Sequence, residues 1–238
     1  MDHPVALITG ASRGIGRALA LKFGAAGYRT VLTARQQEAL QETATMIEKQ
    51  GGHQPLTVAV DLMDMKQIEA LARQAEDAFG RVDVLVNNAG VLHLKPFLEI
   101  TPDELEEMLK VNIQAVFELT RRVVPGMIER RSGSIVNIAS LAGKHGFKTG
   151  TGYAATKFAL RGFAQSLMLE LREHDIRVIT VFPGSVHTRM IGRNPHAPRS
   201  ETMLQAEDVA HAVFAAVSVD SRAMMSEIDI RPSNPKRG

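Results

Sequence analysis

The sequence contains no cysteine, few aromatic residues, no long apolar run and no dense cluster of basic residues. The absence of cysteine excludes disulfides, thiolate metal sites and a cysteine nucleophile, and it leaves the redox compartment open. No apolar stretch approaches the about 20 residues that a membrane-spanning helix requires, so no membrane partner is expected. A strand-like run begins at Val5. We therefore expect no secretory signal and a cytoplasmic location.

Charge and composition describe an ordinary globular chain. The 238 residues carry a formal net charge of +2, and 45% of them are apolar. Outside the C-terminal tail, the only tight basic pairs are Arg121-Arg122 and Arg130-Arg131. Nucleic-acid binding requires Lys and Arg gathered on one face, so no nucleic-acid partner is expected. The length predicts one domain over residues 1–238, with a polar tail at 232–238 that frays.

Strand-like runs alternate with helical spacing along the whole chain, without a repeat or linker. The predicted strands are Val5–Thr9, Thr30–Ala34, Leu56–Val60, Val82–Val86, Gly133–Ile138, Arg177–Phe182 and Ser226–Ile230. The predicted helices are Arg17–Ala26, Gln36–Lys49, Met65–Phe79, 102–129, Gly152–Glu173 and Glu207–Val217, and residues 185–200 are predicted to be irregular. This alternation predicts an α/β fold, a Rossmann-type doubly wound parallel sheet of about seven strands with helices on both faces. Ligands of such sheets bind at the carboxyl ends of the strands, where the winding reverses.

The first predicted strand is followed by the glycine-rich turn 10–16 (Gly-Ala-Ser-Arg-Gly-Ile-Gly) and then by a helix. Glycines allow the backbone to approach a pyrophosphate, and the start of a helix offers unpaired N–H groups. Arg35 follows the second strand, where an acidic residue would hold the ribose of NAD. Arg13 lies in the glycine turn, and two guanidiniums suit a 2′-phosphate. The sequence therefore favours NADP(H).

Further polar residues follow other predicted strands. Asp61 comes directly after the third strand and either borders the adenine or caps the helix Met65–Phe79. The segment Asn87-Asn-Ala-Gly90 follows the fourth strand, and its small residues and amides suit a backbone packed against a cofactor, although Asn is also a common turn residue. Asn112 lies in the middle of a predicted helix, where Asn is disfavoured. Such local conflicts collect at functional sites.

Tyr153 and Lys157 lie one turn apart on the predicted helix Gly152–Glu173. A nearby ammonium ion favours the phenolate, and a tyrosine made acidic in this way can donate a proton near neutral pH. The spacing alone also fits a tyrosine at the edge of the core with a lysine in solvent.

Taken together, these motifs resemble those of the short-chain dehydrogenase/reductase family. They occur in order from about Val5 to the last predicted strand, and they comprise Thr9–Gly16, Asn87–Gly90, Asn112, Ser140, Tyr153 with Lys157, and Pro183-Gly184. The resemblance implies that Tyr153 is the general acid in reduction and the base in oxidation, and that Ser140 binds the substrate oxygen. It implies that Lys157 lowers the pKa of Tyr153 and holds the nicotinamide ribose, and that Asn112 anchors a water linking Lys157 to solvent.

The resemblance also implies NADP(H) as the coenzyme, no metal, and a defined set of binding residues. The implied coenzyme site consists of Gly10, Ser12, Arg13, Gly14, Ile15, Gly16, Arg35, Asp61, Leu62, Asn88, Ala89, Gly90, Tyr153, Lys157, Pro183, Gly184, Val186 and Thr188. The expected activity is the NADP(H)-dependent interconversion of a small ketone or aldehyde and an alcohol, as in a carbonyl reductase. A homodimer or homotetramer is expected, because the helices 102–129 and 152–173 carry apolar residues beyond one face.

Two alternative functions remain open from the sequence. One is a 3-oxoacyl-carrier-protein reductase, for which Arg130-Arg131 offers a basic dock but Glu173-His-Asp175 opposes a second basic contact. The segment Ser226–Pro232 also lacks the glycine pair that such enzymes usually carry after the last strand. The other alternative is a catalytically silent NADP-sensing protein. The short segment after Gly184 predicts an open site with broad substrate tolerance.

Overall fold

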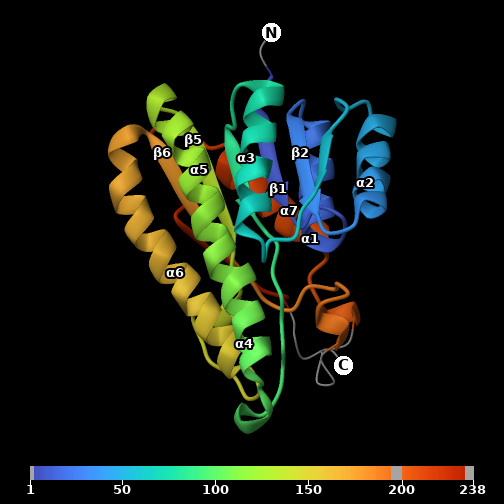
Figure 1. Cartoon of the computed structure of the whole chain (residues 1–238), viewed down its shortest axis with the longest axis vertical. Coiled ribbons are helices and arrows are strands. Elements are labelled where there is room, and N and C mark those ends of the chain that lie inside the picture. Colours follow the sequence, from blue (N-terminus) through green and yellow to red (C-terminus); the bar gives the residue numbers. More distant parts are fainter. Residues whose placement is uncertain (1–2, 194–199, 234–238) are drawn as a thin grey trace.

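The structure, a computed structural model, describes residues 3–193 and 200–233. Its strands form one parallel sheet in the order β3-β2-β1-β4-β5-β6-β7 (Figure 1). The strands are β1 Val5–Thr9, β2 Arg29–Ala34, β3 Leu56–Ala59, β4 Val84–Asn87, β5 Gly133–Ile138, β6 Ile176–Pro183 and β7 Glu227–Ile230. The predicted doubly wound parallel sheet is therefore confirmed. Most of the tail predicted to fray, residues 234–238, and residues 194–199 of the predicted irregular segment lie outside the described residues.

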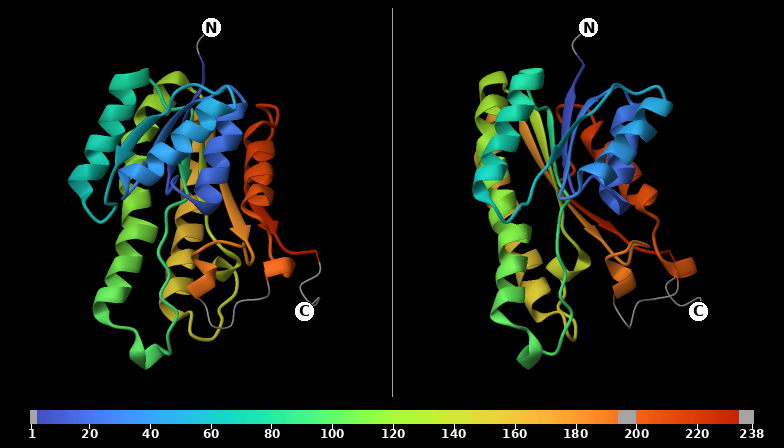
Figure 2. Two further views of the ribbon diagram at one scale, coloured as in Figure 1. Left: turned by 90° about the vertical axis from the view of Figure 1, so that its right-hand side faces the viewer. Right: turned by 45° about the vertical axis from the view of Figure 1, so that its right-hand side comes forward.

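Helices cover both faces of the sheet (Figure 2). One face carries α1 Gly14–Ala25, α2 Gln37–Lys49 and α7 Ala206–Val217, and the other carries α3 Met65–Phe79, α4 Pro102–Leu109, α5 Ala115–Arg130 and α6 Thr151–Leu171. Short 3₁₀ turns lie at Phe97–Glu99, Leu141–Gly143, Arg172–His174, Ile191–Arg193 and Ser200–Thr202. Within the described residues, no helix combines the length and the apolar character needed to cross a membrane.

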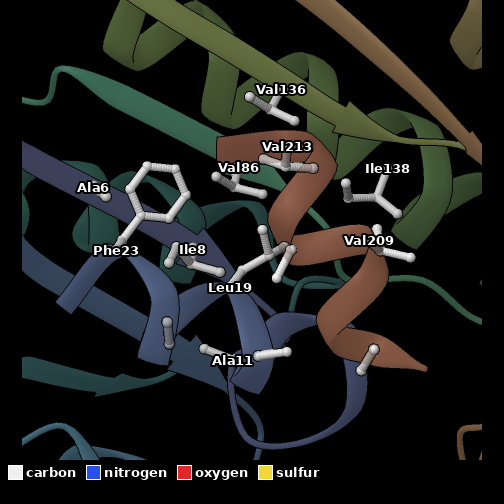
Figure 3. Close-up of a cluster of buried hydrophobic side chains, with 14 of the residues drawn as sticks. Ala6, Ile8, Ala11, Leu19, Phe23, Val86, Val136, Ile138, Val209 and Val213 are labelled. Carbon is white, nitrogen blue, oxygen red and sulfur yellow. The ribbon is translucent and has the colours of Figure 1, made fainter. Parts of the chain in front are cut away.

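The two faces of β1 explain why its first four residues, 5–8, are all apolar. Ala6 and Ile8 point into the core formed with α1 and α7, whereas Val5 and Leu7 point into the core formed with α3 and α5. Figure 3 shows the first of these cores. A parallel strand that is covered on both faces has no position for a polar side chain, so its pattern is continuous rather than alternating.

The helix predicted over 102–129 is divided in two. A π-helical turn, Lys110–Gln114, joins α4 to α5, and Asn112 lies within this turn with only 1% of its surface exposed. Such turns insert one extra residue into a helix and occur often at functional sites. Asn112, a residue that is disfavoured inside a regular α-helix, therefore lies where the α-helix is interrupted.

The residue that caps α3 differs from the predicted one. Asp64 accepts hydrogen bonds from the backbone N–H groups of Lys66 and Gln67, whereas the side chain of Asp61 accepts one from Met63. The prediction that Asp61 could cap this helix was wrong. An N-cap must directly precede the first helical residue, and three residues separate Asp61 from Met65.

The apolar residues that favoured an oligomer divide into two groups. Val116 and Leu160 are buried within the chain, so they need no partner. Phe117 and Phe158 of the neighbouring helices α5 and α6 are exposed. The homodimer or homotetramer stays a prediction that rests on these exposed side chains.

Glu227 holds the edge strand β7 to the rest of the fold through ion pairs. Its carboxylate accepts hydrogen bonds from Nε of Arg161 at 2.8 Å and lies 2.9 Å from Nζ of Lys144. The hydrogen bond from Arg161, followed by that from Lys144, outweighs burial and lowers the pKa of Glu227 to about 2. Because the folded pKa lies below the ordinary value of 4.5, this stabilisation is present above about pH 4.5 and is lost as the pH falls towards 2.

We expect Glu227→Gln to lower the free energy of unfolding by about 2 kcal/mol at pH 7, the scale of hydrogen bonds to a charged group. The difference from the unmodified chain should shrink as the pH falls below about 4.5. Urea unfolding at several pH values measures both effects. Glu173→Gln is the control, because this exposed side chain has only a 3.6 Å contact with His174. An equal loss in both variants would contradict the role of the ion pairs.

Candidate active site

A cavity of 1210 Å³ opens at the carboxyl ends of the strands, where the winding reverses between β1 and β4. With one exception, all the residues predicted to bind the coenzyme or to act in catalysis line this cavity. The exception is Asn112, which lies behind the cavity wall. The fold therefore brings the polar residues that follow the strands together at one cavity, as predicted.

The glycine-rich turn owes its shape to backbone conformations and contacts that side chains would prevent. Gly10 and Gly14 have φ angles of +67° and +53°, in the left-handed region that favours glycine. A Cβ atom on Gly16 would lie 2.1 Å from the carbonyl oxygen of Gly10, so a side chain there collides with the backbone. Arg17 fixes the turn from behind, because its Nη2 donates to the carbonyl of Ser12 at 2.6 Å. Sequence reasoning did not identify Arg17.

Thr9 and Asn88 join the ends of β1 and β4 beside this turn. The hydroxyl of Thr9 accepts hydrogen bonds from the backbone N–H groups of Asn88 and Ala89, both at 3.0 Å. Nδ2 of Asn88 donates back to the carbonyl of Thr9 at 2.8 Å. Asn88 thus has a structural role in addition to its place on the cavity wall. In the sequence, Thr9 appeared as the last residue of a strand and the first of the motif Thr9–Gly16, without a role of its own.

The end of the cavity near β2 carries the two predicted arginines. Arg13 and Arg35 both line it and are exposed, as is Asp61. Thr33 also lines it, and its buried hydroxyl has no hydrogen-bond partner among the described residues. The first turn of α1 contains no acidic residue and has no side-chain cap, so its positive end faces the cavity uncompensated. This set of donors and positive charges fits a dinucleotide that carries an additional phosphate.

Ser140, Tyr153 and Lys157 meet at the other end of the cavity. Ser140 follows β5, and its Oγ accepts a hydrogen bond from the backbone N–H of Ala142 at 3.1 Å. The side chain of Ser140 acts on the phenol of Tyr153 and favours a lower pKa of that phenol. Nζ of Lys157 donates to the carbonyl of Ile138 at 3.1 Å and lies 5.6 Å from the centre of the Tyr153 ring.

Burial controls the protonation of both groups on α6. It raises the pKa of Tyr153 to about 12, against a smaller opposite effect of the hydrogen bond with Ser140. It lowers the pKa of Lys157 to about 8. The direction for Tyr153 is opposite to the one predicted from the spacing of the two residues. The reason is that loss of solvent disfavours the charged form of each group, and the ammonium lies against the Ile138 carbonyl rather than the phenol oxygen.

Asn112 is connected to the catalytic residues by hydrogen bonds through Val91 and Thr156. Its Oδ1 accepts from the backbone N–H of Val91 at 2.9 Å, and its Nδ2 donates to the carbonyl of Val91 and to Oγ1 of Thr156, both at 3.0 Å. Thr156 in turn donates to the carbonyl of Tyr153 at 2.8 Å. The side chain of Asn112 therefore ties the π-helical turn to α6 and to the segment after β4. The predicted water anchored by Asn112 stays a prediction, and Thr156 had no signal in the sequence beyond its place before Lys157.

Comparison with known proteins agrees with this arrangement. The profile of the short chain dehydrogenase family matches residues 4–198. The chain is 38% identical over 193 residues to dehydrogenase/reductase SDR family member 7B of Bos taurus, covering 79% of this chain and 59% of the bovine protein. It is 33% identical over 232 residues to an uncharacterized oxidoreductase of Staphylococcus saprophyticus, covering 98% of each chain.

Among solved structures, the chain is similar to a metagenomic short-chain oxidoreductase in complex with NADP. The two are 38% identical, the TM-score is 0.86, and the similarity covers 97% of each chain. The sheet order, the glycine turn and the tyrosine–lysine pair define a class of α/β oxidoreductase. The chain belongs to the short-chain dehydrogenase/reductase family.

Proposed function

We propose that the chain is an NADP(H)-dependent oxidoreductase that interconverts a small ketone or aldehyde and the corresponding alcohol. One observation carries the proposal. A single cavity connects the glycine turn and two arginines at one end with Ser140, Tyr153 and Lys157 at the other. The NADP-bound relative supports the choice of coenzyme. The coenzyme, when bound, supplies or accepts the hydride, and the protein supplies orientation and proton transfer.

The residues at the catalytic end fit the proton chemistry of this reaction. In reduction, Ser140 and the phenol of Tyr153 bind the carbonyl oxygen, and the phenol gives its proton to that oxygen. Burial raises the pKa of Tyr153, so the phenol carries the proton that reduction consumes. The Lys157 ammonium, next to the ring, stabilises the phenolate that remains. In oxidation the phenolate takes the proton from the alcohol.

The residues at the other end are assigned to the coenzyme. The glycine turn and the start of α1 bind the pyrophosphate, and Arg35 with Arg13 binds the 2′-phosphate. The remaining lining residues, Asp61, Leu62, Asn88, Ala89, Gly90, Pro183, Gly184, Val186 and Thr188, surround the adenine, the riboses and the nicotinamide. Loss of NADPH absorbance with a panel of ketones and aldehydes tests the proposal. No oxidation of NADPH with any of them, and no reduction of NADP⁺ with alcohols, would contradict it.

We expect Arg35→Ala to raise the Kd for NADPH by about 10–100-fold, because a hydrogen bond to a charged group is lost. The Kd for NADH, which has no 2′-phosphate, should change little. Fluorescence titration of both coenzymes measures the two constants. Arg29→Ala is the matched control, because Arg29 is the first residue of the strand that Arg35 follows and therefore lies at the other end of that strand, away from the cavity. Equal weakening of NADPH and NADH by Arg35→Ala would overturn the assignment.

The contacts of the two arginines at 130 and 131 argue against a 3-oxoacyl-carrier-protein reductase. Arg131 pairs with Asp175 at 2.8 Å, and Arg130 donates to the carbonyl of Val82 at 3.0 Å. The charge of Arg131 is therefore paired and the side chain of Arg130 is partly buried, which weakens the basic dock that an acidic carrier protein requires. Comparing acetoacetyl thioesters with simple ketones as substrates separates the two functions. A silent NADP sensor is disfavoured because the complete set of proton-transferring residues lies in the cavity.

A further inference from the structure

Glu107 places a negative charge in the wall of the cavity near the catalytic end. It lies on α4, one turn before Val111, and both residues line the cavity. Met108, the residue that follows Glu107, is fully buried and packs in one cluster with Tyr153. Glu107 is therefore adjacent in sequence to a residue that packs with the proposed proton donor.

The hydrogen bonds of Glu107 leave part of its carboxylate unused. Oε2 lies 2.6 Å from Nε2 of His93. Because a carboxylate only accepts hydrogen bonds, Nε2 carries the proton, and a neutral imidazole satisfies this contact. Among the described residues, no polar partner contacts Oε1. One carboxylate oxygen is thus held in place and the other is available on a side chain that is 28% exposed.

The surrounding charges do not neutralise Glu107. Glu104, the next acid on the same helix, is already paired, because Lys95 lies 2.5 Å from its Oε1 and the backbone N–H of Thr101 donates to its Oε2. Nδ1 of His93 lies 3.7 Å from Glu104, beyond hydrogen-bond distance. The cations on the cavity wall belong to other elements: Lys157 on α6, Arg189 in the segment after β6, Arg231 after β7, and Arg13 and Arg35 at the coenzyme end. With a neutral His93, the wall beside α4 therefore keeps the charge of one carboxylate.

Much of the rest of this wall is apolar. The segment after β4, the start of the π-helical turn and the loop after β5 contribute Val91, Leu92, Leu94, Val111, Leu141 and Phe147, and His145 is a polar residue of the same loop. A small-molecule site that is mostly apolar, with one placed charge, selects an apolar body that carries a complementary charge. The catalytic pair Ser140 and Tyr153 fixes where the carbonyl lies, and Glu107 would fix the far end of the same molecule.

We propose that Glu107 selects carbonyl substrates that carry a cationic amino group separated from the carbonyl by an apolar spacer. The inference rests on the proposed function for the position of the carbonyl. Oε1 of Glu107 accepts the ammonium hydrogen bond, and His93 holds the carboxylate in place. Because hydrogen bonds to a charged partner are stronger than those between neutral groups, a cationic substrate should be favoured by about tenfold or more over its neutral counterpart.

The test uses three ketones of one shape: 4-(aminomethyl)acetophenone, neutral 4-ethylacetophenone and anionic 4-(carboxymethyl)acetophenone, each with NADPH. For the unmodified protein, kcat/KM should rank cation, neutral, anion. Glu107→Gln should reduce the preference for the cation over the neutral ketone to near one, because the amide still accepts from His93 but carries no charge. The control is Glu106→Gln on the same helix, whose carboxylate pairs with Lys110 at 2.7 Å and does not line the cavity.

A binding measurement keeps the test independent of turnover. Calorimetric titration in the presence of NADP⁺ compares 4-(aminomethyl)benzamide with 4-ethylbenzamide, whose amide carbonyls are not reduced. The charged ligand should bind about tenfold more tightly, and Glu107→Gln should remove this difference. If no ketone is reduced but the difference in binding appears, the proposed function fails while the role of Glu107 stands. A preference for the anion or for neither ligand, or an equal loss in Glu106→Gln, overturns the inference.

Discussion

Replacing Tyr153 with phenylalanine is expected to lower kcat by about 10²–10⁴-fold, the contribution of a positioned proton donor. The ring, which is buried and packs against Met108 and Ala142, is retained, so the fold and the cavity should be unchanged. The phenol is the group that the structure places in contact with Ser140 and next to Lys157. NADPH binding should persist, because the glycine turn and the arginines are untouched.

The chain offers a matched control for this change, because it contains only one other tyrosine. Tyr28 packs edge-on against Phe23 and Phe214, away from the cavity, and burial raises its pKa as well. Tyr28→Phe should therefore leave kcat unchanged. Steady-state rates with a reducible ketone, together with NADPH titration, distinguish the outcomes. An unchanged kcat in Tyr153→Phe would remove the phenol from the mechanism, and a loss of NADPH binding would show that the phenol acts through the coenzyme site.

Replacing Gly16 with alanine is expected to lower the free energy of unfolding by about 3 kcal/mol, at the upper end for overpacked sites. The added methyl group would lie 2.1 Å from the carbonyl oxygen of Gly10 and 2.5 Å from Nδ2 of Asn88. The obstacle is largely backbone, so it cannot turn away as a flexible side chain would. The glycine turn must shift, and NADPH binding should be lost with it.

Gly162→Ala is the control for the glycine change. Gly162 lies in α6, and a Cβ atom built there meets nothing within 4 Å. Alanine should stabilise this helix position by about 0.5–1 kcal/mol, because it loses less conformational entropy than glycine. Thermal unfolding and coenzyme titration of both variants measure the effects. If Gly16→Ala unfolded at the same temperature as the unmodified chain and still bound NADPH, the close approach in the glycine turn would not be needed.

Much of the fold could be read from local patterns. Continuous apolar runs marked the strands because each central strand is buried on both faces, as the two sides of β1 demonstrate. Strand boundaries agreed with the structure within one or two residues. The glycine turn was also identifiable, since only glycine adopts the φ angles of +67° and +53° found at Gly10 and Gly14 without strain. The capping box that Thr101 and Glu104 form at the start of α4 is likewise specified by neighbouring residues in the sequence.

Other features depend on contacts between segments that are far apart in the chain. The π-helical turn at Asn112 is held by Val91 and Thr156, and no pattern within the helix predicts it. The same holds for Glu107, which is one of several acids on α4 and is distinguished only by facing the cavity. The pairing of Arg131 with Asp175, which weakens the case for a carrier-protein dock, likewise appears only when α5 meets the end of α6.

The sequence by itself determined the order of strands and helices, the glycine turn, and which residues would meet at the carboxyl ends of the strands. These follow from burial and backbone conformation, which are properties of short segments. Only the tertiary structure decided the protonation of the catalytic pair. Whether an ammonium lowers the pKa of a phenol depends on the distance between them and on how much water each has lost. At Tyr153 and Lys157 the loss of water prevails.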